Sequence, residues 1–279
     1  MAEDNESPVL RFDRVSVAFD TTPALSDVSF QAYEGESRVI MGATGSGKTV
    51  LLKTALGLQR PDSGTVYVFG KDISRMRERE LFDIRSRIGM LFQESALFDS
   101  LNIEENVSYP LLNQPSIHCP PEQVRPRVEE ALRFVELEGT LEKFPSELSG
   151  GMRRRAAIAR AVVTQPPLVL YDSPTAGLDP ITARTIMALV VKERDLNKTT
   201  TLLVTYRYQD GDLVANFRYN PEDGSLERAG KGSGTNGGNP ADRTFFMVLR
   251  EGRLVFEGPQ SELEASQDPY VSKFVKHRE

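Results

Sequence analysis

The sequence predicts an α/β fold built on a parallel sheet, and two apolar runs indicate this class. Residues 37–41 form a short buried-strand pattern, which a glycine-rich loop and a helical pattern from residue 49 follow. Residues 167–172 form a second apolar run that ends in Asp172. Parallel sheets have continuous hydrophobic strands and bind ligands beyond the carboxyl ends of those strands. The 279 residues, 39% of them hydrophobic, are enough to bury the core of one domain with subdomains.

The loop from Gly42 to Thr49 has the composition of a phosphate-binding loop. Its glycines allow positive φ and leave no Cβ between the backbone and a phosphate, so the amides can form a nest for the anion. Lys48 supplies a mobile positive charge, and the Thr49 hydroxyl is suited to ligate Mg²⁺ beside a nucleoside triphosphate. The alternative is a glycine-rich turn with an incidental lysine, and the flanking strand and helix argue against it. The expected phosphate contacts are Gly42, Ala43, Thr44, Gly45, Ser46, Gly47, Lys48, Thr49 and Val50.

Asp172 follows the second apolar strand, so we expect it at the carboxyl edge of the sheet. There the carboxylate can hold the magnesium shell, through water. An aspartate that caps the turn before Pro174 would fit equally well in isolation. The phosphate loop upstream and the segment Ala176-Gly177-Leu178-Asp179 downstream favour the metal role.

The motif Leu148-Ser-Gly-Gly-Met152 precedes a predicted helix over residues 152–163, so its amides and the Ser149 hydroxyl form a second anion-binding helix start. Together with the phosphate loop it resembles the ATP-binding-cassette (ABC) ATPases, from about Val9 to the C-terminus. The resemblance implies a P-loop NTPase core of RecA-like fold with an antiparallel β-subdomain and an inserted α-helical subdomain. It also implies ATP with Mg²⁺, clamped between the phosphate loop of one subunit and Ser149, Gly150 and Gly151 of another.

Three further residues match the family pattern. The resemblance implies that Phe19 stacks on adenine, although it could instead be a core residue of its strand. Gln93 matches the glutamine that reaches Mg²⁺ and reports occupancy to a membrane partner, and Asp179 matches an aspartate at the subunit contact.

Arg153, Arg154 and Arg155 follow the second motif, and we expect at least two of them on a solvated helix face.

Two positions break the family pattern. Ser173 stands where the family usually has a glutamate that activates the attacking water, and Tyr206 stands where it has a histidine that contacts the γ-phosphate. A serine hydroxyl is a poor base, and tyrosine does not titrate near neutrality. General-base help is typically worth about 10²–10⁴-fold, so we expect a slow ATPase. ATP binding and closure of the clamp need neither residue.

Three explanations of these substitutions stay open. The site is intrinsically slow and spends long periods closed, or a neighbouring group such as Glu94 orients the water. In the third, the chain forms a heterodimer with a non-identical ABC ATPase. Its intact Ser149 motif would then complete the site at which the partner hydrolyses ATP. The chain would therefore dimerise with itself or with a paralogous ABC ATPase.

The resemblance also predicts how the chain is divided. The ABC ATPase domain covers residues 9–265, with a C-terminal tail over 266–279. Its antiparallel strands lie in 9–33 and 62–73, its parallel core in 34–60, 84–93 and 166–206, and its helical subdomain in about 94–160. A glycine-rich segment over about 229–241 is too polar to pack and predicts a mobile loop within a hairpin.

Residues 87–111, 149–161 and 268–275 resemble the Mla-type ATPases of MCE-associated lipid transporters. The resemblance implies a polytopic membrane permease, an MCE-domain lipid-binding protein, phospholipid cargo and the cytoplasmic face of the inner membrane. A net charge of −6 gives no electrostatic reason to bind nucleic acid, and one cysteine argues against a disulfide framework. The alternatives are a catalytically degenerate regulatory ABC subunit paired with an active paralogue, and a soluble ABC protein that acts outside transport.

Overall fold

The computed structural model describes residues 7–229 and 239–276, and its centre is a six-stranded sheet in the order β12-β11-β3-β8-β7-β6. Neighbours from β11 to β6 run parallel, whereas β12 pairs with β11 antiparallel. The strands are β3 (Ser37–Gly42), β6 (Ile88–Leu91), β7 (Leu168–Asp172), β8 (Thr200–Val204), β11 (Thr244–Arg250) and β12 (Arg253–Pro259). Every residue of β3, β7 and β8 is buried, as continuous apolar runs require. The predicted α/β class is confirmed.

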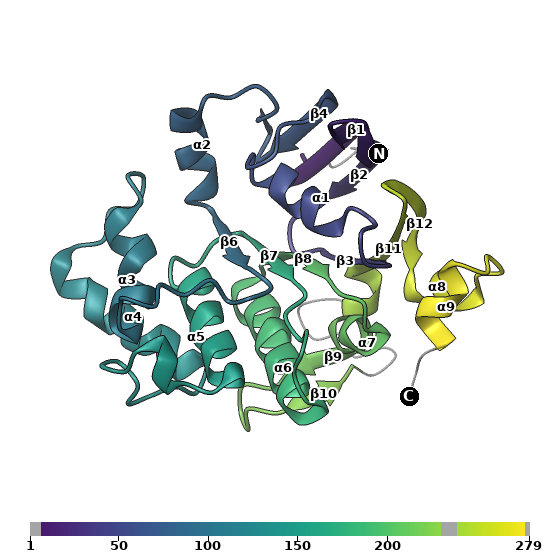
Figure 1. Cartoon of the computed structure of the whole chain (residues 1–279). Helices are drawn as coiled ribbons and strands as arrows, with labels where there is room; N and C mark the ends of the chain where they lie inside the picture. The colour runs from purple at the N-terminus through teal and green to yellow at the C-terminus, as the bar shows by residue number, and fades with distance from the viewer. Residues whose placement is uncertain (1–6, 230–238, 277–279) are drawn as a thin grey trace, which may run out of the picture.

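Alternate residues of the central strands face two separate apolar cores, because successive side chains of a strand point to opposite faces. Ile40, Leu170 and Leu202 belong to the core above the sheet in Figure 1, with α1 and the antiparallel strands. Val39 and Val169 belong to the core below it, which α5, α6 and α7 cover. These helices are α1 (Lys48–Ala55), α5 (Gly150–Val162), α6 (Pro180–Asn197) and α7 (Tyr208–Asn216). The helices that follow the two glycine motifs therefore lie on opposite faces of one sheet.

A second, antiparallel sheet of four strands in the order β2-β1-β4-β5 packs over α1 (Figure 1). Its strands are β1 (Leu10–Phe19), β2 (Thr22–Ala32), β4 (Ser63–Val68) and β5 (Lys71–Asp72). Phe12 of β1 stacks on Phe30 of β2 with ring centroids 4.8 Å apart, inside the upper core. Helix α2 (Glu78–Arg85) then leads back to β6 in the central sheet.

The chain between β6 and β7 is helical. It forms α3 (Ile103–Asn113), α4 (Pro121–Phe134), the 3₁₀ turn η1 (Pro145–Glu147) and α5. Val107 of α3 and Val128 of α4 share the lower core with α5 and α6. These helices share one core with the lower face of the sheet. The helical subdomain over 94–160 therefore stays a prediction from sequence, because it has no separate core of its own.

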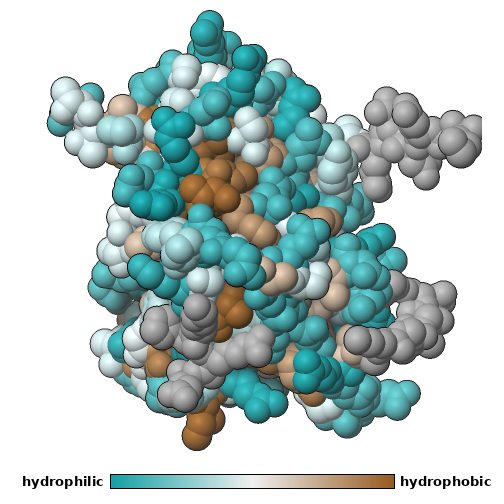
Figure 2. Space-filling model, turned by 90° about the vertical axis from the view of Figure 1, so that its right-hand side faces the viewer, coloured by the Kyte–Doolittle hydropathy of each residue, from teal (hydrophilic) through white to brown (hydrophobic). Residues whose placement is uncertain are grey.

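After α7 the chain leaves the central sheet and rejoins it at β11. It contains the hairpin β9 (Phe217–Tyr219) and β10 (Leu226–Arg228), the 3₁₀ turn η2 (Pro240–Arg243), α8 (Gln260–Ala265) and α9 (Val271–Lys276). Most of the mobile loop predicted over 229–241 lies outside the described residues. On the face that carries β12, α8 and α9, the visible surface is mainly hydrophilic with small apolar patches (Figure 2). Within the described chain, every helix is too short or too polar to cross a membrane.

Candidate functional site

The strand register brings the sequence motifs to one edge of the central sheet. Ile40 of β3 pairs with Val204 of β8, and Val204 pairs with Asp172 of β7. Tyr171 of β7 pairs in turn with Leu91 of β6. All four strands are parallel, so their carboxyl ends meet at the edge where such sheets bind ligands. The expected site residues at or just beyond these strand ends are Gly42, Gln93, Ser173 and Tyr206.

The phosphate loop turns sharply into α1 at Gly47, whose φ is 103°. A Cβ at Gly47 would lie 2.3 Å from the Ala24 carbonyl oxygen, so only glycine fits there. The Lys48 ammonium donates to the carbonyl oxygens of Gly42 at 2.8 Å and Ala43 at 2.7 Å. Burial lowers the pKa of Lys48, and the charge of Asp172 opposes this effect. The lysine therefore spans the mouth of its own loop, next to the start of α1, where the helix dipole favours an anion.

Thr49 and Asp172, two of the expected magnesium ligands, lie in direct contact. The Thr49 hydroxyl donates to Asp172 Oδ2 at 2.9 Å, and Asp172 is 3% exposed. In the described chain no group of three or more His, Cys, Asp or Glu side chains could hold a metal. One carboxylate beside one hydroxyl suits Mg²⁺, which usually takes one or two carboxylates and completes its shell with water and phosphate oxygens. The donor set therefore fits a metal that arrives with a nucleotide.

Ser173 and Tyr206, the two departures from the family pattern, both lie at this edge. Ser173 has a φ of 51°, and its hydroxyl donates to Asp172 Oδ1 at 3.2 Å. Asp172 therefore receives one hydroxyl on each carboxylate oxygen. Tyr206 is 56% exposed, and Gln93 and Glu94 are exposed on the loop after β6. No ionisable base occupies the position after Asp172.

Phe19 lies at the end of β1, where it pairs with Thr22 of β2 and is 50% exposed. Two residues beyond Thr22, the Ala24 carbonyl lies against the turn at Gly47. The hairpin end that carries Phe19 is therefore close to the phosphate loop. An aromatic ring left half exposed beside this loop can offer a face to a base.

The second glycine motif lines a separate groove of about 540 Å³. Ser149 caps α5 by accepting from the Met152 amide at 3.2 Å, which leaves its O–H free to donate. Asp179 caps α6 by accepting from the amides of Ile181 and Thr182, both at 3.0 Å. The expected trans residues that line the groove together are Ser149, Gly150, Gly151 and Asp179. The lining does not include the phosphate loop, so one chain presents the two glycine motifs at separate places.

The expectation that at least two of the three arginines after Met152 lie on a solvated face is wrong. Only Arg153 is exposed. Arg154 is 7% exposed and donates to main-chain oxygens of the loops after β6 and β7. Arg155 is partly buried and donates to the carbonyls of Val135 and Glu136 at 3.1 and 3.0 Å. Both arginines extend from α5 to main-chain carbonyls of other segments, which charge patterning alone does not reveal.

Asp210 is a buried residue that sequence reasoning missed. Its Oδ2 accepts from the hydroxyls of Thr175 and Thr205, each at 2.6 Å. It thereby joins the loop after β7 to the end of β8, next to Tyr206. Burial raises the pKa of the Asp210 carboxyl, against the two hydroxyls and the charge of Arg207. The only signal in the sequence is that a carboxylate stands four residues after Tyr206, the position where the family has a histidine.

Tyr270 was also missed. Its hydroxyl accepts from the Ala43 amide of the phosphate loop at 3.2 Å and donates to the Leu249 carbonyl at 3.1 Å. The segment before α9 thus reaches the loop from 227 residues away in the chain. No local pattern signals a contact of this span.

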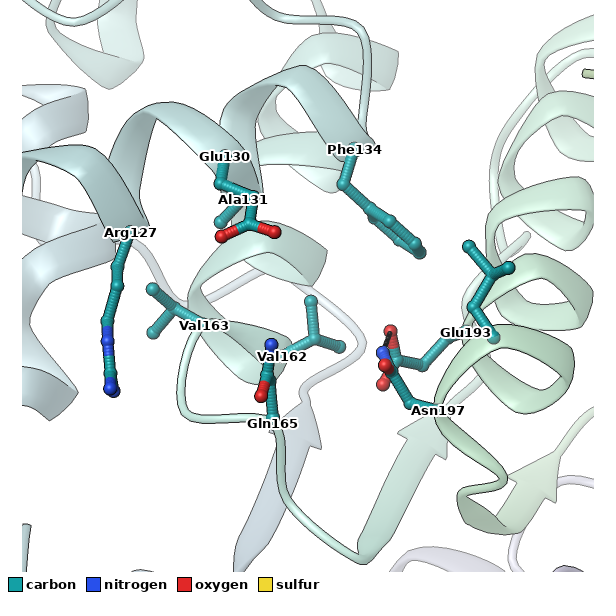
Figure 3. A pocket seen from close by; sticks show the side chains of 10 residues that line it. Arg127, Glu130, Ala131, Phe134, Val162, Val163, Gln165, Glu193 and Asn197 are labelled. Atoms are coloured by element: carbon teal, nitrogen blue, oxygen red, sulfur yellow. Dashed lines mark hydrogen bonds between the residues drawn. The ribbon is translucent and has the colours of Figure 1, made fainter. Parts of the chain in front are cut away.

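A cavity of about 360 Å³ between α4, α5 and α6 lies elsewhere (Figure 3). Arg127 and Glu130 line it from α4, and Glu193 and Asn197 line it from α6. Gln165, another lining residue, precedes β7 and therefore marks the opposite edge of the sheet from Asp172. None of the expected site residues lines this cavity, so it is not part of the nucleotide site.

Comparisons with known proteins agree with this arrangement. A family model described as "ABC transporter" matches residues 25–176. The intermembrane phospholipid transport system ATP-binding protein MlaF of Haemophilus influenzae is 32% identical over 250 residues, 90% of this chain and 83% of that protein. The probable ribonucleotide transport ATP-binding protein mkl of Mycobacterium leprae is 33% identical over 261 residues, 94% of this chain and 67% of that protein.

Among solved structures, the dimeric ATP-binding cassette MJ0796 in a post-hydrolysis state with ADP and Pi is similar to this chain. The TM-score is 0.73 and the identity 28%, over 90% of this chain and 98% of that one. The family match covers more than half of the chain, and the MlaF match covers most of both proteins. The chain therefore belongs to the ABC transporter family, as one of its ATP-binding ATPase subunits.

Proposed function

We propose that this chain powers a phospholipid transporter of the Mla type by ATP-driven dimerisation at the cytoplasmic face of the inner membrane. Its partners would be a polytopic permease and an MCE-domain lipid-binding protein. The observation that carries the dimerisation step is the separation of the phosphate loop from the Ser149 groove, which we call the two half-sites. Different parts of one chain form the phosphate loop and the Ser149 groove, and no residue of the loop lines the groove.

ATP would bind with its phosphates on the amides of residues 42–49 and its base on Phe19. Thr49 and Asp172 would hold Mg²⁺, with Gln93 completing the set, and the metal would neutralise phosphate charge. The hydrogen bond between Thr49 and Asp172 keeps both oxygens in place before the metal arrives. Ser149, Gly150, Gly151 and Asp179 of a second subunit would close the site from the other side.

Slow hydrolysis is part of the proposal. The Ser173 hydroxyl donates to the Asp172 carboxylate, so it is used to order the metal site and cannot take a proton from water at neutral pH. Tyr206 is exposed and can donate a hydrogen bond to phosphate. Closure would thus be fast relative to hydrolysis, and the closed dimer would be long-lived.

The test is ATP turnover by the purified chain with Ser173→Glu, Tyr206→His and the double substitution. A general base and a histidine donor are expected to raise turnover of the double variant by about 10²-fold or more. Affinity for ATP, measured with a fluorescent ATP analogue, should stay within about threefold of wild type, because neither residue belongs to the phosphate loop. Unchanged turnover of the double variant would show that the geometry is not that of a hydrolytic site.

A second candidate is a catalytically degenerate subunit that works with an active paralogue. It is favoured by the intact groove at Ser149 beside the altered positions 173 and 206. Sedimentation of the purified chain with ATP separates the two: a homodimer supports the main proposal. Dimers that form only with a second ABC ATPase, copurified from the native host, support the alternative.

The lipid cargo is proposed from the name of the MlaF relative, and the mkl relative carries a different transport name. Affinity purification of the tagged chain from native membranes tests the point. A permease and an MCE-domain protein that carry bound phospholipid are the expected result. A permease with a periplasmic nucleotide-binding or amino-acid-binding protein would contradict it.

A further inference from the structure

Arg154 in the first turns of α5 is a buried cation whose hydrogen bonds go to main-chain oxygens of two different loops. Its guanidinium donates to the carbonyls of Phe92, at 3.3 Å, and Gln93, both on the loop after β6. It also donates to the Ala176 carbonyl at 3.4 Å, on the loop between β7 and α6. Arg154 is 7% exposed, and its Nε is buried without a partner.

This arrangement is costly, so stability alone does not explain it. Burial lowers the pKa of Arg154, and only the charge of Asp172 opposes the effect. Within the described residues no carboxylate lies within 4.0 Å of this guanidinium. A buried charge that is held by carbonyls and lacks a counter-ion gains less than its desolvation costs.

The two loops that Arg154 joins each contain or lead to an expected nucleotide contact. Gln93 is an expected metal contact, and Ala176 is three residues before Asp179 on the loop that leads into the groove. Arg154 itself lies four residues after Gly150, which is about one helical turn. A rigid fork of five donors can hold three carbonyls in a fixed planar relation, whereas the three donors of a lysine radiate from one atom on a flexible stem.

We propose that Arg154 is a positioning residue that couples the nucleotide site of its own chain to the groove offered to the second subunit. This inference rests on the proposed function of the two half-sites and adds the link between them. When a nucleotide orders the loop at Gln93, the guanidinium moves with that loop and carries the Ala176–Asp179 segment and the start of α5. Both parts of the groove are then in place for the partner's phosphates.

Arg160 supplies a matched control on the same helix. It donates to the Ser95 carbonyl at 3.0 Å and lies over the Phe98 ring at 5.6 Å. Its burial also lowers its pKa. Arg160 thus attaches the same loop to α5, but its described contacts do not include the segment at Ala176. A conservative lysine at either position keeps the charge and removes the forked geometry.

The experiment compares the full chain as wild type, Arg154→Lys and Arg160→Lys, with ATPγS and Mg²⁺ as the probe. Hydrogen exchange is measured at protein concentrations at which sedimentation shows monomer. In wild type, ATPγS should slow exchange together in residues 92–95, 150–154 and 176–179. In Arg154→Lys, protection should remain at 92–95 and be lost in the other two segments, whereas Arg160→Lys should behave as wild type.

Sedimentation with ATPγS then measures dimerisation. Arg154→Lys should weaken the ATPγS-dependent dimer by about tenfold, the scale of one hydrogen bond to a charged group. Its monomer should bind ATPγS within about twofold of wild type, which a general loss of structure would not preserve. Arg160→Lys should dimerise like wild type.

Three results would overturn the proposal. In the first, ATPγS slows hydrogen exchange in wild type at residues 92–95 alone. In the second, Arg154→Lys keeps the slowed exchange in all three segments and dimerises like wild type. In the third, Arg154→Lys and Arg160→Lys lose exchange protection and dimerisation equally. A wild-type chain that shows coupled protection but never dimerises would contradict the proposed function while supporting the link within the chain. A wild-type chain that binds no ATPγS would overturn both.

Discussion

Gly150 is a residue that the fold of its own chain does not require. A Cβ at this position would meet nothing within 4 Å, and the backbone is helical. Glycine costs about 1 kcal/mol relative to alanine in a helix interior, and at this first helical position it offers the fold no packing contact in return. The same chain uses Gly47 where a Cβ would lie 2.3 Å from a carbonyl. The fold therefore does not require glycine at position 150, and the proposed contact with a partner's nucleotide gives a reason for it.

We expect Gly150→Ala to keep or slightly raise the stability of the monomer while abolishing ATP-dependent dimerisation. The added methyl projects into the groove and keeps the partner's phosphates from the amides at the start of α5. Urea unfolding should give a change of less than about 1 kcal/mol. ATP binding by the monomer serves as the control, because the phosphate loop is untouched. Wild-type dimerisation of this variant would contradict a role for the groove.

At the residue scale, the sequence located the phosphate loop, Asp172 and both departures at 173 and 206, because each follows a predicted strand end. It could not assign Arg154. Three arginines in a row look alike in sequence, and only the carbonyls that surround α5 distinguish the buried one from its neighbours. Those carbonyls belong to loops far away in the chain.

Among the elements, α7 shows how tertiary contacts override local preference. Its sequence contains Gly211, Asp210 and Asn216, which favour turns over helix, and its bounds could not be read from periodicity. Gly211 is needed because a Cβ there would lie 2.5 Å from the Phe246 ring. The strands β3, β7 and β8, by contrast, are buried throughout and contain apolar runs, so they were predictable. A helix or strand can be predicted from sequence when the properties of its own residues determine its structure. Where contacts with distant residues determine it, as in α7, the sequence pattern is not enough.

Asp210 of α7 joins two loops at the carboxyl edge of the central sheet, and this leads to a prediction about stability. Thr175 and Thr205 are each 1% exposed, and both hydroxyls donate to Asp210 Oδ2. Asp210→Ala leaves both buried donors without this acceptor and should lower the free energy of unfolding by about 2–4 kcal/mol. Asp210→Asn keeps one oxygen that can accept from both, so its loss should be smaller. Urea unfolding of the two variants measures the difference, and equal losses would contradict it.

Wild type and Asp210→Asn together also test the direction of the pKa shift of Asp210. Burial raises its pKa above the ordinary value of 3.8, so the protonated carboxyl favours folding and the charged one opposes it. This contribution is fully present below pH 3.8 and is lost as the pH rises through the folded-state pKa. Asparagine does not titrate. The stability of wild type relative to Asp210→Asn should therefore fall as the pH rises through that window, and a rise would show that the carboxylate is the favoured form.

For the whole molecule, the central point is that the two proposed half-sites of each chain do not meet within it. The lower core supports α5 and α6, whose starts line the groove, while the upper core supports α1 behind the phosphate loop. One sheet connects them. A head-to-tail pair of such chains would form two composite sites, each with one half from either subunit. Defects in different half-sites should therefore complement each other in a mixture.

Mixing Lys48→Ala with Gly150→Ala chains tests this directly. Lys48→Ala removes the loop's charge but keeps an intact groove, whereas Gly150→Ala keeps the loop and blocks the groove. Each variant alone should form no ATP-dependent dimer, because every composite site contains one defect. The mixed dimer contains one intact site, from the loop of one chain and the groove of the other. Labelling the two chains with different fluorophores and measuring energy transfer with ATP should therefore give a signal only in the mixture. Its affinity should be weaker than that of wild type, since one of two sites contributes. No signal in the mixture, under conditions in which wild type dimerises, would mean that the loop and the groove do not grip the same nucleotide.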